Sequence, residues 1–266
     1  ESKERISAAI KNLGARNPNK KNQRVVISLA HADLKKEGPA FDLSIALAYL
    51  LASKQTKFDT KGKIFLGELA LDGALRPIKG VLALTEEARR KKFLEIYLPE
   101  ENAEEAAFVD GIKVFGVSSL IGILEHLEGK TPIRQMPATK FISGDIMSSI
   151  DFSDVRGQES AKRGLEIAAA GAHNALMIGP PGTGKTMLAL AFAGILPPLS
   201  KEEALEVTKI HSIAGSLGGD IAIITERPFR NPHHTSSYVS LVGGGAFPKP
   251  GEITLAHRGV LFLDEF

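Results

Sequence analysis

The sequence predicts two α/β domains joined by a short connection. The chain has 266 residues, which is more than one small core needs and comfortable for two domains. Helical and strand patterns alternate over residues 1–130 and again from residue 150 onward, whereas residues 131–149 carry two prolines, a glycine and little periodicity. We therefore expect a first domain at 1–132, a linker at 133–149 and a second domain at 150–266.

Two features stand out in the expected first domain. Residues 41–53 are apolar on nearly all sides of a helix, which predicts deep burial. The dipeptide Asp72-Gly73 between two apolar runs is typical of a two-residue hairpin. The expected elements are a helix at 5–13, a strand at 24–30, a helix at 41–53, strands at 63–71 and 74–78, a helix at 81–92, a strand at 95–99, a helix at 101–108, a strand at 112–117 and a helix at 118–128.

The expected second domain begins with a helix at 159–170 that ends at Gly171. A strand at 175–178 leads through a glycine-rich turn into a helix at 185–195, which Pro197-Pro198 stops. Residues 260–263 are predicted to form a buried parallel strand, because four apolar residues precede two acids. The sequence shows no internal repeat and no low-complexity tract.

Composition excludes several classes of protein. No run of eighteen apolar residues is present, and the charged amphipathic start does not read as a signal peptide, so we expect no membrane partner. The absence of cysteine excludes disulfides and thiolate metal sites and fits a cytoplasmic protein. The chain lacks an initial Met and stops at Phe266, directly after an apolar strand, so we expect it to be part of a longer protein.

Net charge gives little indication of a nucleic-acid partner. Residues 1–132 carry 21 Lys and Arg against 18 Asp and Glu, while residues 133–266 carry 12 against 13. Neither domain is basic enough to indicate nucleic-acid binding by bulk charge. Any contact with DNA must therefore come from local loops.

The stretch GPPGTGKT fits the phosphate-binding pattern G-x-x-x-x-G-K-[ST] in full and lies between an expected strand and an expected helix. Its glycines let the backbone turn N–H groups toward phosphate, and the helix start adds a positive dipole end. Lys185 is expected to reach the β- and γ-phosphates, and the Thr186 hydroxyl to ligate Mg²⁺. The candidate nucleotide-binding residues of this loop are Gly179, Pro180, Pro181, Gly182, Thr183, Gly184, Lys185 and Thr186.

A matching acidic strand, GVLFLDEF, closes the sequence. Asp264 is expected to complete the Mg²⁺ shell together with Thr186, and Glu265 to polarise the attacking water. Lys185, Asp264 and Glu265 are therefore the candidate catalytic residues, and ATP and Mg²⁺ the expected cofactors.

Lys185 and Asp264 lie 79 residues apart, which is long for a minimal AAA+ core, so we expect an insertion between them. The intervening text includes RPFRNPHHT, a GGG step and PKPGEITLAHRGVLFLDE. These motifs are long and specific, and together with nearly the whole chain they resemble the magnesium-chelatase-like AAA+ ATPases of the ComM/YifB family. The resemblance implies an ATP-hydrolysing motor that forms a homo-oligomeric, hexameric ring and acts on DNA, with branch migration during transformation as the example.

The resemblance also suggests roles for particular segments. Val155 and Gln158 of the VRGQ step match the position where AAA+ ATPases hold adenine, although an ordinary helix entry would explain the same residues. Residues 243–257 would contain a hairpin that points toward the central pore, with Lys249 and Arg258 facing phosphate; a surface loop without a ligand is the alternative. Porphyrin chemistry is not implied, because nothing in the sequence recognises a porphyrin.

Three other polar features are explained more simply by a structural role than by a functional one. His233 and His234 lack an acidic partner at ligand spacing, and neighbours in a strand would point to opposite faces, which argues against metal. Arg227 and Arg230 are candidates for an intersubunit role, but salt-bridged or solvated arginines are the simpler reading. The basic run at 89–92 is interpreted as a solvated helix end.

The first domain resembles the Lon-protease-like fold, an α+β fold of the ribosomal protein S5 domain 2 type. EGPAFD aligns with the loop that carries the Lon nucleophile, and FLGELALDGALRPIKGVLAL with the stretch leading to the lysine base. Ala40 takes the nucleophile position and Leu82 the lysine position, so both catalytic groups are missing. Ser44 and Lys79 lie a helical turn away, about 5.4 Å, which is too far to substitute. We predict an inactive scaffold.

Three functions therefore compete. The leading one is an ATP-dependent motor that remodels DNA. The alternatives are an ATP-dependent protease of Lon type and a non-catalytic module that uses nucleotide for assembly. Because the sequence ends before any sensor residue or arginine finger, this chain by itself is expected to bind nucleotide weakly and to hydrolyse it poorly.

Overall fold

The chain separates into two compact units, residues 1–140 and 141–266. In the part of the chain that is described, no helix is both long enough and apolar enough to cross a membrane. The computed structural model describes residues 2–16, 25–28, 38–142, 150–217, 221–245 and 248–264.

The first unit is a mixed α/β unit around a three-stranded parallel sheet in the order β1-β4-β5, with a separate β2–β3 hairpin. Helix α4 connects β4 to β5, as parallel neighbours require a crossover. Its elements are α1 (Ser2–Asn12), the 3₁₀ turn η2 (Pro39–Phe41), α2 (Asp42–Ala52), β1 (Lys63–Phe65), β2 (Glu68–Leu69), β3 (Leu75–Arg76), α3 (Val81–Arg90), β4 (Glu95–Pro99), α4 (Glu100–Ala106), β5 (Lys113–Val117) and α5 (Leu120–Leu127).

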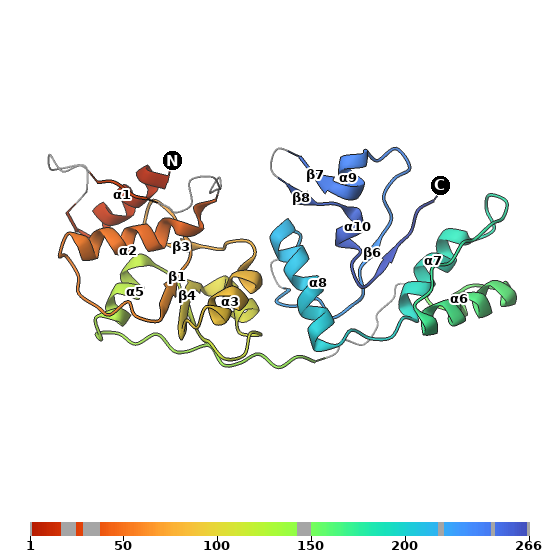
Figure 1. Ribbon diagram of the computed structural model, residues 1–266, viewed down its shortest axis with the longest axis horizontal. Helices are drawn as coiled ribbons and strands as arrows, with labels where there is room; N and C mark the ends of the chain where they lie inside the picture. The colour runs from red at the N-terminus through yellow and green to blue at the C-terminus, as the bar shows by residue number, and fades with distance from the viewer. Residues whose placement is uncertain are drawn as a thin grey trace. The chain divides into compact units, whose positions relative to one another are not determined.

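The core of this unit lies between the sheet and the helices. Helices α1 and α2 lie side by side (Figure 1), and both bury apolar side chains in this core. The Tyr97 ring stacks on Phe65 and Phe115, with centroids 5.2 and 4.8 Å away. Helix α2 lies where the sequence predicted a helix, and the predicted deep burial holds for one face only: Leu43 and Leu47 are buried, whereas Ala48 and Ala52 face solvent.

The expected strand at 63–71 is broken by Gly67 into β1 and β2. Gly67 donates its N–H to the Ala40 carbonyl and accepts from the Leu43 N–H, so it turns away from the sheet to hold the start of α2. A Cβ at this position would lie 2.9 Å from a Leu75 methyl carbon, which favours glycine. The predicted hairpin around Asp72-Gly73 is confirmed by the pairing of β2 with β3, but the predicted two-residue turn is wrong, because Leu69 pairs with Leu75 and Ala70 bonds to the Ala74 carbonyl, which leaves a longer turn.

Two further expectations for this unit need adjustment. Of the predicted strand at 24–30, the structure describes only 25–28, and these four residues form no strand. The linker expected at 133–149 starts later, because residues 133–140 are fastened to the first unit. Ile133 donates to His126 Nδ1 at 2.8 Å, and Met136 to the Val114 carbonyl at 2.8 Å. Residues 143–149 lie outside the described ranges.

The second unit combines helices with two small two-stranded sheets. Strands β6 and β9 are parallel, and β7 and β8 are antiparallel. Helices α6 and α7 pack together beside the glycine-rich loop (Figure 1). Its elements are η3 (Phe152–Asp154), α6 (Glu159–Gly171), α7 (Lys185–Gly194), α8 (Lys201–Ala214), β6 (Phe229–Arg230), α9 (Tyr238–Val242), β7 (Gly243–Gly244), β8 (Lys249–Pro250), α10 (Glu252–Leu255) and β9 (Val260–Leu261).

The predicted strand at 175–178 does not form. None of the described residues pairs with this segment, and Leu176 and Ile178 are 85% and 90% exposed. A strand requires a hydrogen-bonded neighbour, so an apolar pattern alone does not make one. The predicted strand at 260–263 is parallel as expected, but β9 covers only two of its residues. Its expected burial is wrong, because Leu263 is exposed and the rest is only partly buried.

Candidate functional site

The glycine-rich loop at 179–186 adopts a backbone that favours glycine. Gly182 and Gly184 have φ of +80° and +82°, in the left-handed region that other residues rarely occupy. A Cβ at either position would meet no atom within 4 Å, so the requirement lies in the backbone angles and not in space. Gly184 is the residue before α7, so the loop delivers the chain directly to a helix N-terminus.

Lys185 is the first residue of α7 and its side chain folds back over the loop. Its Nζ donates to the Gly179 carbonyl at 3.0 Å and to the Pro180 carbonyl at 3.1 Å. The Thr183 hydroxyl donates to the same Pro180 carbonyl at 2.9 Å. The ammonium group is therefore held at the mouth of the loop, beside the free N–H groups of the first helical turn.

Thr186 and Asp264 lie together although they are far apart in the sequence. The Thr186 hydroxyl lies 3.4 Å from Asp264 Oδ2, which joins the first turn of α7 to the segment after β9. A hydroxyl and a carboxylate are hard oxygen donors, the kind that Mg²⁺ prefers. This pair fits the expected metal ion by its donor chemistry. Glu265 lies outside the described residues.

The two candidate adenine residues lie in different surroundings. Gln158 has a left-handed backbone with φ of +61°, and its Nε2 donates to the Thr183 carbonyl at 3.4 Å. It lines a cavity of about 650 Å³ that extends along α6 to Gly179 and Lys185. Val155 is buried against Leu165 and Leu188. The structure therefore brings Gln158 to the loop and gives Val155 a packing role.

Arg230 forms an ion pair inside the second unit, as the simpler reading of the sequence held. Its Nε and second guanidinium nitrogen donate to the two Glu252 oxygens at 2.6 and 2.8 Å. The hydrogen bond from Arg230 lowers the pKa of the Glu252 carboxyl. Paired in this way, Arg230 joins strand β6 to α10.

Arg258 is engaged by two glutamates of helix α8. Its guanidinium lies 3.4 Å from Glu203 and 3.0 Å from Glu206, and the bond from Arg258 lowers the pKa of Glu206. His257 Nε2 lies 3.3 Å from the same Glu206. Sequence reasoning missed both glutamates as partners, because the only local signal, Ser200 three residues before Glu203, indicates the capping box that starts α8.

The hairpin expected within residues 243–257 is present as β7 and β8. Lys249 is exposed on β8, in contrast to the paired Arg258. Gly243 has φ of +93°, and a Cβ there would lie 2.6 Å from the Lys249 carbonyl oxygen, so the two strands approach through glycine. Residues 246–247 of this hairpin lie outside the described ranges.

His233 and His234 lie in an irregular segment. They are not in a strand, so the expectation that their side chains point to opposite faces does not apply. Their rings face each other with centroids 4.1 Å apart, and His233 Nδ1 lies 2.8 Å from the Thr235 hydroxyl. Within the described ranges, no cluster of three or more His, Asp or Glu side chains is arranged to hold a metal ion.

The protease positions of the first unit carry no catalytic pair. Ala40 lies in η2, and the Leu82 side chain is fully buried. The Ser44 hydroxyl donates to the Phe65 carbonyl, and Lys79 is exposed.

The basic run at the end of α3 behaves as a helix end, because Arg90 and Lys91 both pair with Glu87.

The second unit, with its parallel strands and a glycine-rich loop that opens a helix, fits the class of P-loop nucleotide-binding α/β proteins. Residues 151–266 match the family described as magnesium chelatase, subunit ChlI, and residues 1–102 match subunit ChlI of Mg-chelatase. Over the whole chain the identity is 47% to YifB of Salmonella typhimurium and 42% to competence protein ComM of Haemophilus influenzae. The chain belongs to the ComM/YifB family of magnesium-chelatase-like proteins.

The chain spans about half the length of these relatives, 51% of YifB and 52% of ComM. A partial likeness links it to Lon protease 2 of Bacillus subtilis, which is 32% identical over 124 residues, covering 43% of this chain and 22% of that protein.

Proposed function

We propose that this chain is the nucleotide-binding part of a Mg²⁺-dependent ATPase, a AAA+ motor that acts on DNA. The observation that carries the proposal is the contact between Thr186 and Asp264 beside the Lys185 loop. A loop alone could bind many anions. A hydroxyl and a carboxylate brought together across 78 positions supply the metal-binding oxygens that nucleotide hydrolysis also needs.

Each residue then has a defined task. The N–H groups of the loop and of the first turn of α7 bind phosphate oxygens, and Lys185 turns from the loop carbonyls to the β- and γ-phosphates. Thr186 and Asp264 hold Mg²⁺, which neutralises negative charge on the phosphates when bound. Glu265, directly after Asp264, orients and polarises the attacking water. Gln158, which lines the cavity beside the loop, would contact the base.

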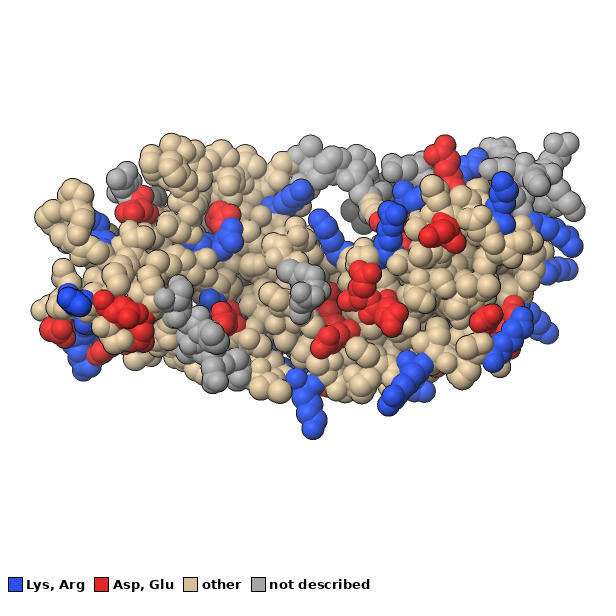
Figure 2. Space-filling model, turned by 180° about the vertical axis from the view of Figure 1, so that it is seen from behind, with Lys and Arg blue, Asp and Glu red and all other residues tan. Residues whose placement is uncertain are grey.

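DNA is proposed as the partner on narrower grounds. The name competence protein belongs to ComM, a relative over the whole chain. The exposed Lys249 on the β7–β8 hairpin is a local cation that can meet a phosphate backbone. On the face shown in Figure 2, basic and acidic side chains of the described residues are interspersed. We therefore expect few phosphate contacts and a shallow salt dependence of DNA binding.

The first unit is proposed to be a Lon-protease-like α+β scaffold at residues 1–132 that helps a homo-oligomeric, hexameric ring to assemble in the cytoplasm. The partial likeness to Lon protease 2 supports the fold. Ala40 and Leu82, where that chemistry needs a hydroxyl and an amine, favour a scaffold over a protease. A module that uses nucleotide only for assembly remains the second candidate, and hydrolysis separates the two.

Nucleotide binding is tested directly with a fluorescent ATP analogue in the presence of Mg²⁺. Lys185→Ala removes an ammonium that bonds phosphate, so its affinity should fall about tenfold to a hundredfold. Lys113→Ala, at an exposed position of β5, is the matched control and should bind as the wild type does. Equal affinity of the Lys185→Ala variant and the wild type would refute the proposed site.

Hydrolysis and the role of DNA need a second assay. Phosphate release by the full-length protein is measured with and without branched DNA. The wild type is compared with Glu265→Gln, which keeps the shape of the residue and removes its charge. DNA-stimulated release that disappears in Glu265→Gln supports the motor. Nucleotide binding without any hydrolysis, in the full-length protein, would favour the assembly module instead.

A further inference from the structure

Strand β9 leads the chain to Asp264, but it forms only a short ladder with its neighbour β6. It matches β6 at only two register positions, Phe229 with Val260 and Arg230 with Leu261. Two further backbone bonds flank them, from Val260 N–H to the Pro228 carbonyl and from Phe262 N–H to the Arg230 carbonyl, both 2.8 Å. A two-stranded ribbon of this length is marginal in water, so other contacts must fix where β9 lies.

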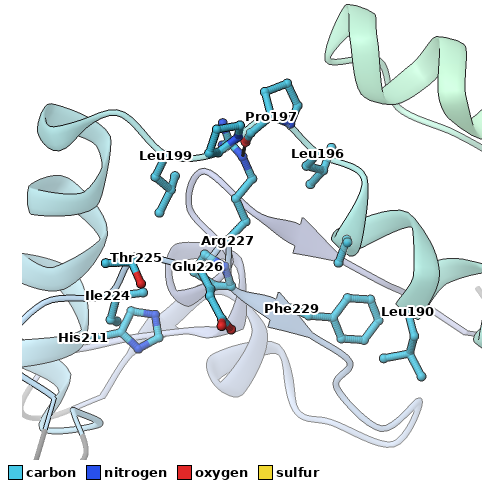
Figure 3. Close-up of a pocket in the computed structure, with 14 residues that line it drawn as sticks. Leu190, Leu196, Pro197, Leu199, His211, Ile224, Thr225, Glu226, Arg227 and Phe229 are labelled. Atoms are coloured by element: carbon cyan, nitrogen blue, oxygen red, sulfur yellow. Dashed lines mark hydrogen bonds between the residues drawn. The ribbon is translucent and has the colours of Figure 1, made fainter. Parts of the chain in front are cut away.

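Arg227, directly before Pro228 and β6, supplies such contacts. Its Nε donates to the Pro197 carbonyl at 2.5 Å, one terminal nitrogen donates to the Arg258 carbonyl at 2.5 Å, and the other donates to Glu203 at 3.4 Å. Figure 3 shows its side chain extending toward Pro197 along the wall of a cavity of about 340 Å³. The side chain is only 16% exposed. One guanidinium thus joins three segments of the second unit.

The turn that Arg227 holds is a demanding one. Arg258 has φ of +61°, unusual for a residue with a side chain, and Gly259 follows it. A Cβ on Gly259 would lie 2.0 Å from the Pro228 carbonyl oxygen, so the turn and the segment before β6 are in close contact. Such a backbone persists only when its surroundings hold it. Arg227 donates to the Arg258 carbonyl, and Glu203 forms an ion pair with the Arg258 side chain.

These contacts link the two halves of the proposed metal site. Pro197 follows α7, the helix whose first turn carries Thr186, and Arg258 begins the segment that ends at Asp264. Arg227 bonds to both segments at once. We propose that Arg227 is a positioning residue, which keeps Thr186 and Asp264 at the separation that Mg²⁺ requires. This inference rests on the proposed function and gives Arg227 no contact with nucleotide.

The test compares affinity for a fluorescent ATP analogue with Mg²⁺ and with EDTA, because only the first depends on Thr186 and Asp264 being in place. Arg227→Lys keeps the charge but loses the planar fork that reaches three acceptors. We call the ratio of the affinity with Mg²⁺ to the affinity with EDTA the magnesium-dependent gain. In Arg227→Lys this gain should fall about tenfold, the size of one charged hydrogen bond, while the affinity in EDTA stays at the wild-type value. Arg163→Lys, on the exposed face of α6, is the matched control.

A second variant and a double variant separate positioning from folding. Glu203→Gln preserves volume and should reduce the magnesium-dependent gain in the same direction. In an Asp264→Asn background, Arg227→Lys should have no further effect, because the two residues act through one site. An unchanged gain in Arg227→Lys and Glu203→Gln, or equal losses with Mg²⁺ and EDTA, would overturn the inference. A wild type without any magnesium-dependent gain would instead overturn the proposed function, and the inference with it.

Discussion

The Thr186 hydroxyl and the Asp264 carboxylate lie 3.4 Å apart at the junction of helix α7 with the segment that follows strand β9. One belongs to the loop motif and the other to an acidic strand that is 78 residues away. A separation of this size suits two groups that share a ligand better than two that bond strongly to each other, since hydroxyl to carboxylate bonds are usually shorter. The relationship makes the proposed metal dependence of this site testable residue by residue.

Thr186→Val replaces the hydroxyl with a methyl group of the same shape, and Thr186→Ser retains it. We expect the valine variant to lose about tenfold in affinity for ATP with Mg²⁺, because one oxygen ligand is missing, and the serine variant to stay close to wild type. Titration calorimetry with and without Mg²⁺ measures both. Wild-type magnesium dependence in the valine variant would exclude Thr186 as a ligand.

His126 should make the first unit less stable in mild acid. Its Nδ1 accepts a bond from the Ile133 N–H, so the neutral ring carries its hydrogen on Nε2, which faces the Tyr97 hydroxyl. Burial lowers the pKa of His126 below its ordinary value of 6.5, with Glu95 opposing and Lys63 adding to the effect. The unfolded chain then takes up the proton first, so stability falls as pH drops below about 6.5.

The measurement is the melting temperature between pH 8 and pH 5 in the wild type and in His126→Asn. Asparagine can still accept from Ile133 and does not titrate, so its melting temperature should change less over this range. An equal decline in both proteins would show that the acid sensitivity arises elsewhere.

Asp42 should be a stabilising residue of the first unit. Its carboxylate is 1% exposed and accepts from Ser2 at 2.6 Å and from Arg5 at 2.9 Å, which ties α1 to the start of α2. Asp42→Asn removes the buried negative charge that accepts from Arg5 and should lower the free energy of unfolding by about 2–3 kcal/mol. Urea unfolding checks this, with the exposed Asp59→Asn as a control that should cost little.

The first unit should not cleave peptides. Ala40 and Leu82 supply neither nucleophile nor base, and the Ser44 hydroxyl is bonded to the Phe65 carbonyl. Fluorescent casein incubated with the protein, ATP and Mg²⁺ should stay intact over hours. Degradation that Ser44→Ala abolishes would reverse this conclusion.

The sequence predicted those parts of the fold that depend on local chemistry. The hairpin at Asp72-Gly73 follows from turn chemistry, and helices α6 and α7 follow from helical periodicity with their observed limits within one residue. The prediction of a strand at 175–178 was wrong for a non-local reason. The apolar pattern of this segment is that of a strand, but no described residue pairs with it. Gly67 was likewise unpredictable, because the break depends on contacts with Ala40 and Leu43.

The candidate site shows the same division. The loop motif identified Lys185 and Thr186, and the acidic strand identified Asp264, because each motif has a fixed local pattern. The motifs also predicted that Thr186 and Asp264 would lie together, and the two side chains are 3.4 Å apart in the structure. The ion pairs of Arg227 and Arg258 with Glu203 carry no sequence signal, because their spacing follows from how α8 packs.

The aromatic stack in the first unit also determines what a spectroscopist can observe in this protein. The chain has three tyrosines and no tryptophan. Tyr97 lies buried between two phenylalanines and Tyr49 is half-buried in the same unit, whereas Tyr238 of the second unit is already 76% exposed. Intrinsic tyrosine fluorescence will therefore report melting of the first unit and change little when the second unit melts. A tryptophan placed at Phe229 would give the second unit an optical signal of its own.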